Sequence, residues 1–70
     1  MKRHALLKKI RKAAKAKELT YTEQELTRHT GITVDTVSTT VPRHTEIDDL
    51  LGEKICKQLE PALGEGWWRK

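Results

Sequence analysis

The residues best suited to chemistry are the three histidines of the chain, His4, His29 and His44. Each of them directly follows an arginine, in the pairs Arg3-His4, Arg28-His29 and Arg43-His44. An imidazole with an unperturbed pKa of about 6.5 can accept or donate a proton near neutral pH. Cleavage of RNA without a metal needs such a base for the ribose 2′-hydroxyl, an acid for the leaving oxygen and cations that hold the phosphate. The arginine–histidine pairs supply the residue types for that reaction.

The sequence offers little for metal or nucleotide chemistry. It contains neither a Cys-x-x-Cys nor a His-x-x-x-His pair, and Asp48-Asp49 alone is a weak ligand pair. A phosphate-cradling glycine loop and a Gly-x-Ser-x-Gly turn are also missing from the sequence. The lone cysteine, Cys56, is expected to be a small buried residue rather than a nucleophile. We therefore expect no metal and no cofactor, and a single thiol fits a reducing cytoplasm.

The length and charge of the chain predict one small domain, residues 1–70, with an anionic partner. A chain of this size buries only about 60% of the surface that its unfolded form exposes. The net charge of +4 and the pI of about 9.5 favour polyanions. No apolar run approaches the roughly 20 residues of a membrane span. Leu6-Leu7 is followed by Lys8-Lys9 rather than by the apolar region of a signal peptide, so we expect a cytoplasmic protein.

The histidine in the middle of the chain lies in a segment, Leu26–Val34, that has the alternating pattern of a strand. Successive side chains of a strand point to opposite faces, so one face can be buried while the other is wet. The apolar side chains expected on the buried face are Leu26, Ile32 and Val34. His29 is expected on the wet face, flanked in sequence by Arg28 and Thr30.

Two further strands are expected on either side of this segment. Within residues 18–25, Leu19 and Tyr21 alternate with threonines, although Glu23-Gln24-Glu25 interrupts the pattern. After an Asp35-Thr36 turn, Val37, Thr39 and Val41 alternate with Ser38 and Thr40, which predicts a third strand. Pro42 should end this last strand, because proline cannot donate to the ladder.

Helices are expected before and after the strands. Residues Lys2–Lys17 carry an apolar stripe at helical spacing, formed by Leu6, Leu7, Ile10, Ala13 and Ala14. A second helix is expected from about Asp49 to Glu60, with Asp48 or Asp49 as its cap and Pro61 as its end. Its stripe is formed by Leu51, Ile55 and Leu59. The predicted fold is α+β, in the order α-β-β-β-α, with a three-stranded antiparallel sheet and both helices on one face. The other face, with His29, should be exposed.

The first helix is strongly basic. Apart from His4, every ionisable side chain through Lys17 is a cation, namely Lys2, Arg3, Lys8, Lys9, Arg11, Lys12, Lys15 and Lys17. One interpretation is a phosphate-binding surface, in which Lys8 and Lys12 join Arg28, Arg43 and His44 as RNA contacts. The alternatives are a solvated helix face and a helix on a membrane surface, although the latter would lack an aromatic anchor.

Several segments of the chain resemble the HicA toxin family. The segments are Leu26-Thr-Arg-His29-Thr-Gly-Ile32, Thr39-Thr-Val-Pro42-Arg-His44-x-Glu-Ile47 and Lys54-Ile-x-Lys-Gln-Leu59. The basic helix and the ending Gly64-x-Gly-Trp-Trp-Arg-Lys70 are similar to those of actinobacterial and actinophage members. Two departures stand out. Leu26-Thr27-Arg28 replaces glycines that many members have, and Gly52 precedes Glu53 where a Gly-Thr pair often opens the last helix.

This resemblance implies a fold similar to a double-stranded-RNA-binding domain and the activity of a toxin of a type II toxin–antitoxin system. Such a toxin cleaves mRNA without a metal, with a histidine of the second strand as general acid or base, and His29 occupies that position. His44 matches a Pro-x-His position, where it either fixes the loop or takes part in proton transfer or phosphate contact. The implied partners are mRNA and a HicB-type antitoxin that covers the site and binds operator DNA.

Two other functions fit the same residues. The chain could be a non-catalytic module that binds double-stranded RNA by its shape and phosphates. It could also be a protein-interaction or DNA-associated subunit whose basic helix docks an acidic partner. Trp67 and Trp68 could stack on bases, but we expect one to pack over the core and the other to contact a partner.

Overall fold

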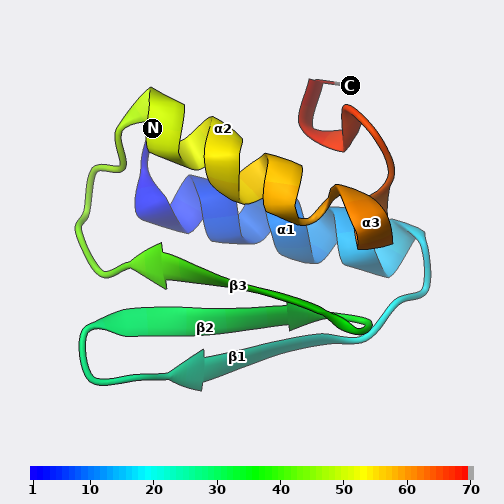
Figure 1. Ribbon diagram of the computed structural model, residues 1–70, viewed down its shortest axis with the longest axis horizontal. Coiled ribbons are helices and arrows are strands. Elements are labelled where there is room, and N and C mark those ends of the chain that lie inside the picture. Colours follow the sequence, from blue (N-terminus) through cyan, green and yellow to red (C-terminus); the bar gives the residue numbers. More distant parts are fainter. Residues whose placement is uncertain (70) are drawn as a thin grey trace.

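The computed structural model describes residues 1–69, so Lys70 of the Trp-Trp-Arg-Lys ending lies outside the described residues. The elements are, in chain order, α1 (Arg3–Ala16), β1 (Tyr21–Glu25), β2 (His29–Val34), β3 (Val37–Pro42), α2 (Asp49–Gln58), α3 (Glu60–Leu63) and a 3-10 turn, η1 (Trp67–Arg69). The three strands form one antiparallel sheet in the order β1-β2-β3. Both long helices lie against one face of it (Figure 1). The predicted α+β fold is confirmed, with α3 and η1 added after the last predicted helix.

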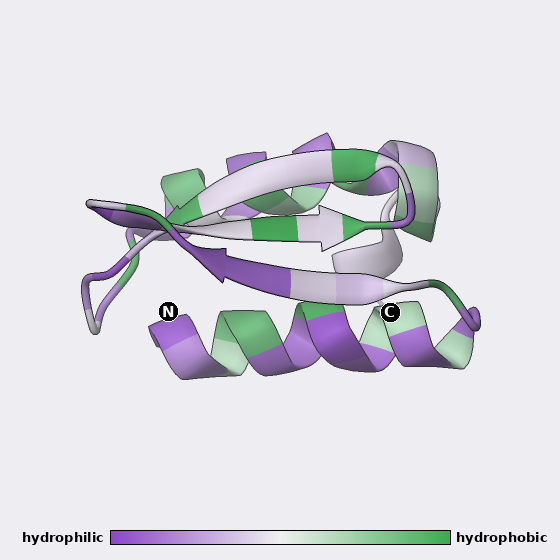
Figure 2. Cartoon of the chain, turned by 90° about the horizontal axis from the view of Figure 1, so that it is seen from below, coloured by the Kyte–Doolittle hydropathy of each residue, from purple (hydrophilic) through white to green (hydrophobic). Residues whose placement is uncertain are grey.

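The sheet and the helices enclose a single apolar layer. Every second residue of β2 points into it, because Thr30, Ile32 and Val34 are fully buried. The helices contribute the predicted stripe of α1 together with Ile55 and Leu59. Figure 2, which looks onto the open side of the sheet, shows α1 along the β1 side and α2 along the β3 side. The other sheet face is left uncovered among the described residues.

The stripe of α1 lies inside this layer, which removes one interpretation of the basic helix. Leu6, Leu7, Ile10 and Ala14 are all buried. A helix on a membrane surface would need these side chains free to enter the lipid. That alternative is therefore wrong for the folded chain. Within residues 1–69, no helix has the length and apolar character needed to cross a bilayer.

The strand around His29 begins later than predicted. Residues 26–28 form the turn between β1 and β2, closed by a 2.8 Å hydrogen bond from the Leu26 amide to the His29 carbonyl. The prediction that Leu26 shares a buried face with Ile32 is wrong. Its side chain is 39% exposed and lies over Gly31 on the open face, because the chain must reverse direction here and strand alternation no longer applies.

Strand β1 includes the three residues that interrupted the predicted pattern. Glu23 and Glu25 point to the same side as Tyr21, but they lie on the edge strand and reach cations instead of the core. Glu23 lies 4.0 Å from Arg11, and Glu25 lies 2.8 Å from Arg43. An edge strand next to a basic helix therefore accommodates carboxylates at inward positions.

The second predicted helix divides into α2 and α3. Pro61 does not end a helix but lies in the first turn of α3, where a missing amide hydrogen breaks no helical bond. Leu51 is 37% exposed rather than part of the core, since the buried position of that turn is Gly52, which lies against the Met1 side chain. Asp48 is the N-cap residue, as predicted, but its side chain makes no capping hydrogen bond.

Two predictions about single side chains are confirmed. Cys56 is buried, and burial raises the pKa of its thiol. Trp67 packs over the core and donates a 2.8 Å hydrogen bond from its indole nitrogen to the Cys56 carbonyl. Trp68 is half-buried beside it, and its expected contact with a partner stays a prediction.

The half-buried Tyr21 should make stability fall at alkaline pH. Burial and the neighbouring Glu23 carboxylate, which accepts a 2.8 Å hydrogen bond from the hydroxyl, raise its pKa well above the usual value of 10.0. Above about pH 10 the unfolded chain releases this proton before the folded chain does, so the stabilisation present below that pH is lost. Urea denaturation at several pH values should show a steeper alkaline decline for the wild type than for Tyr21→Phe. Equal slopes for the wild type and Tyr21→Phe would contradict the attribution of the alkaline decline to Tyr21.

Candidate functional site

The catalytic candidate, His29, opens β2 at one end of the sheet. Its Cα pairs with that of Pro42, the last residue of β3, and its side chain is exposed. Arg28 comes directly before it in the turn, and Arg43 and His44 come directly after Pro42 in the loop. This end therefore gathers four of the six predicted site residues. Figure 1 shows the turn between β1 and β2, the loop after β3 and the N-terminus of α1 at the same end of the molecule.

The open sheet face next to His29 is polar and almost uncharged. The strand residues on this face are Thr22, Gln24, His29, Gly31, Thr33, Ser38, Thr40 and Pro42. Two of its hydroxyls, those of Thr33 and Ser38, lie 3.0 Å apart in a hydrogen bond. No lysine or arginine stands at these strand positions of the described chain. The face could accept sugars and bases, but it has no cation of its own to hold a phosphate.

A hydrogen-bonded network lies under the His29 end, on the helix side of the sheet. Arg3, at the start of α1, donates to the Thr30 hydroxyl and, over 3.1 Å, to the Pro42 carbonyl. The Thr30 hydroxyl in turn donates to Glu25 at 3.2 Å. Thr30 is fully buried at the edge of the apolar layer, and this network gives its hydroxyl the hydrogen-bond partners that a buried polar group needs. The network joins α1 to all three strands directly below His29.

Arg43, whose side chain is exposed, contacts the same network through Glu25. Its guanidinium lies 2.8 Å from Glu25 and donates a hydrogen bond to the Leu26 carbonyl. These contacts tie the loop after β3 to the turn before His29. Arg43 is therefore engaged in holding the site together, and a phosphate would have to share it with Glu25.

Arg28 and His44 are less constrained. Both are exposed, and the ion pairs of the described residues do not include Arg28. The side-chain hydrogen bonds of residues 1–69 do not include the His44 ring, so its role in fixing the loop stays a prediction. The neighbouring Glu46 instead pairs with Lys2 at 2.6 Å, and this bond lowers the pKa of the Glu46 carboxyl. Arg28 is thus the arginine of this end that is freest to meet an anion.

The remaining predicted contacts, Lys8 and Lys12, lie on another element, α1. They are exposed on α1, where Lys8, Arg11, Lys12 and Lys15 line one shallow hollow. Figure 2 shows α1 along the β1 side of the sheet, whereas His29 opens the central strand β2. Lys8 and Lys12 therefore belong to a helix beside the edge strand and not to the open face that carries His29.

Arg3 and Glu25 are the residues that sequence reasoning missed. The sequence pattern presents Arg3 only as one cation of a basic helix and Glu25 only as an interruption of a strand. The partners of Arg3, Thr30 and Pro42, are 27 and 39 positions away in the chain. Only the fold reveals such pairings, so no local pattern could have identified them.

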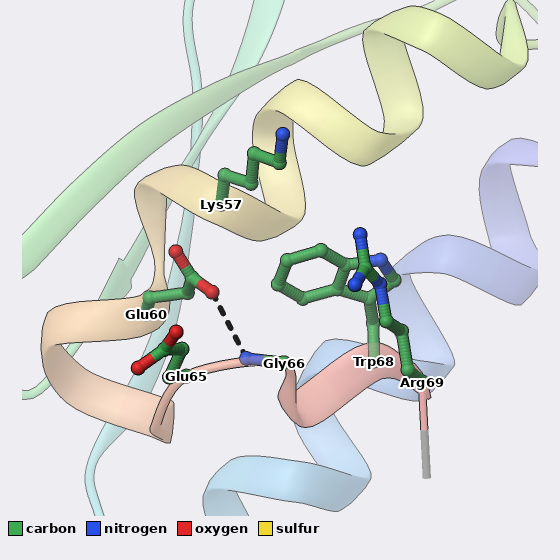
Figure 3. A pocket seen from close by; sticks show the side chains of 6 residues that line it. All are labelled: Lys57, Glu60, Glu65, Gly66, Trp68 and Arg69. Atoms are coloured by element: carbon green, nitrogen blue, oxygen red, sulfur yellow. Dashed lines mark hydrogen bonds between the residues drawn. The ribbon is translucent and has the colours of Figure 1, made fainter.

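Another hollow lies between the end of α2 and the C-terminal turn (Figure 3). It measures about 520 Å³ and is lined by Lys57, Glu60, Glu65, Gly66, Trp68 and Arg69. Its two cations both pair with Glu53, at 3.7 and 3.3 Å. The Arg69 guanidinium also lies 5.3 Å from the centre of the Trp68 ring. Since charges of both signs already neutralise one another there, the hollow has no clear preference for a ligand.

Comparison with protein-family models, curated proteins and solved structures finds no match to this chain. The resemblance to HicA toxins therefore stands on the sequence motifs alone. No group of three or more histidine, cysteine or acidic residues within residues 1–69 is arranged to hold a metal ion.

Removal of the Arg3 guanidinium should destabilise the domain from the His29 end. Arg3→Met keeps most of the aliphatic stem but takes the donors away from Thr30 and Pro42, so we expect a loss of about 1–3 kcal/mol. Arg11→Met is the matched control, because the one ion pair that Arg11 makes within residues 1–69, to Glu23, is long and exposed and should contribute less than about 1 kcal/mol. Urea denaturation measures both losses. Equal losses of unfolding free energy in the two variants would show that the Arg3 network stabilises the domain no more than an exposed ion pair does.

Proposed function

We propose that this chain is a HicA-type mRNA-cleaving toxin, a metal-independent endoribonuclease of a type II toxin–antitoxin system. His29 is its general acid or base, its substrate is mRNA in the cytoplasm, and its partner is a HicB-type antitoxin. The observation that carries the proposal is the position of His29, exposed at the start of the second strand beside Arg28, within a chain whose motifs resemble that family.

The reaction needs only proton transfers and a held phosphate. A base removes the proton of the ribose 2′-hydroxyl, the 2′-oxygen attacks the adjacent phosphorus, and the bond to the 5′-oxygen breaks as an acid returns a proton to it. The products are a 2′,3′-cyclic phosphate and a 5′-hydroxyl. His29 carries out one of these transfers, and His44, two residues beyond its strand partner Pro42, is the candidate for the other.

The phosphate contacts follow from which cations are free. Arg28, in the turn before His29, is the first candidate for the scissile phosphate, whereas Arg43 is shared with Glu25 and Leu26. Lys8 and Lys12 would hold RNA that extends from His29 to α1, since they line a hollow on that helix. Removal of Arg28 should then harm cleavage more than removal of either lysine.

A non-catalytic RNA-binding module is the second candidate, and one observation favours it. Four cations of α1 line one hollow, whereas no lysine or arginine stands on the open sheet face that carries His29, so RNA held by α1 would not by that contact be placed on His29. Such a module would retain RNA through phosphate contacts with a steep loss of affinity in salt, and it would leave the strands intact.

Loss of the His29 imidazole should abolish toxicity. A positioned proton transfer contributes about 10²–10⁴-fold, so purified His29→Ala should cleave RNA slower by that factor, and its induction in bacteria should leave growth unaffected. Exposed His4, on α1, provides the matched control, because His4→Ala also removes an imidazole but should keep full activity. Equal toxicity of the wild type and His29→Ala would exclude this mechanism. RNA that binds both proteins and stays intact would favour the binding module.

The cleaved linkage should require its own 2′-hydroxyl. An RNA with one 2′-deoxyribose at a mapped cleavage site should resist cleavage at that linkage alone, and the normal products should end in a 2′,3′-cyclic phosphate. Excess EDTA should leave the rate unchanged. Cleavage of the deoxy linkage, or full inhibition by EDTA, would point to attack by a metal-bound water instead.

A further inference from the structure

A second surface, on the far side of α1 from the strands, has the properties of a docking site for a protein. Lys9, Lys12, Ala13, Ala16 and Trp67 line a hollow of about 350 Å³ there. A second hollow of about 260 Å³ shares Ala13, Ala16 and Trp67 with the first. Its other lining residues are Lys17, Leu63, Gly64 and Glu65. The shared residues make the two hollows one groove along the C-terminal half of α1, which we call the α1–Trp67 groove.

The walls of this groove are apolar and fixed. The alanines at positions 13 and 16 leave room beside the helix because their side chains are short. Trp67 forms the opposite wall, with its indole held by the 2.8 Å hydrogen bond to the Cys56 carbonyl and its ring packed edge-on against Trp68. A rigid wall keeps the groove open, and the space fits apolar side chains of moderate size.

The rim of the groove is strongly positive. Lys9, Lys12 and Lys17 line it, and Lys8, Arg11 and Lys15 follow on the adjoining side of α1. The ion pairs of residues 1–69 include only Arg11 from this set, at 4.0 Å from Glu23. Glu65 is the one acidic lining residue among those described. An occupant must therefore combine apolar side chains with several negative charges.

We propose that the α1–Trp67 groove binds an acidic amphipathic segment of a partner protein. Its apolar side chains enter between Ala16 and Trp67, and its carboxylates meet the lysines of the rim. An RNA backbone would satisfy the same cations, but it has no aliphatic group for the apolar floor. This proposal does not depend on catalysis by His29, because none of the residues that line the groove belongs to the open sheet face or to the His29 end of the sheet.

The test uses synthetic probes and two matched variants of the full chain. One labelled peptide carries leucines at i, i+3 and i+4 on a glutamate-rich helix, a second has glutamine in place of each leucine, and the third probe is a labelled RNA duplex. Ala16→Leu fills the groove, whereas Ala5→Leu adds the same side chain at an exposed position of α1 outside the groove lining. Binding is measured by fluorescence anisotropy, with circular dichroism to show that each variant is folded.

We expect the leucine peptide to bind the wild type about tenfold more tightly than the glutamine peptide. Ala16→Leu should remove this difference, and Ala5→Leu should keep it. Lys12→Glu should weaken both peptides. If both peptides bind equally, or if Ala16→Leu leaves the difference intact, the apolar groove has no role and the proposal is wrong. Tighter binding of the RNA duplex than of either peptide, unaffected by Ala16→Leu, would assign the surface to nucleic acid instead.

Discussion

The burial of one apolar layer between the sheet and its helices is the constraint on which the rest of the structure depends. A chain of 70 residues has too few apolar side chains to cover both faces of a sheet, so one face stays open. Once Ile32 and Val34 point into the layer, strand alternation sends His29 and Gly31 to the open side. The exposure of His29 is thus a consequence of core burial, whatever chemistry it performs.

The apolar layer ends at Thr30, and the polar contacts that Thr30 makes there form part of the candidate site. A buried hydroxyl must find hydrogen-bond partners, and here Arg3 and Glu25 provide them. Glu25 then also attracts Arg43, which ties the loop after β3 to the turn before His29. The same set of contacts closes the core and fixes the backbone under the histidine. It also explains why Arg43 is less free to meet a phosphate than its sequence position suggested.

The spacing of the apolar residues predicted the fold well. Side chains that enter the apolar layer recur with a period of 3.6 residues in the helices and of 2 residues in the strands. The stripe of α1, the alternation in β3 and the exposure of His29 all follow from those periods. The errors arose where another constraint overrode the local pattern. Leu26 lies in a reversal of the chain, and Pro61 lies where a helix begins rather than ends. The network around Arg3 could not be predicted, because its partners come together only when α1 packs on the sheet.

The charges of α1 show that its surface is not optimised for the isolated domain. Lys8 and Lys12, and likewise Arg11 and Lys15, are like charges four residues apart, and each such pair destabilises a helix by about 0.2–0.5 kcal/mol. The helix forms nevertheless, because Leu6, Leu7 and Ile10 are buried in the core. Within the described chain, the ion pairs of these cations include only the long contact from Arg11 to Glu23, so ion pairs do little there to offset the repulsion. An anion bound along α1 would relieve the repulsion, so binding there and stability of the domain are thermodynamically linked.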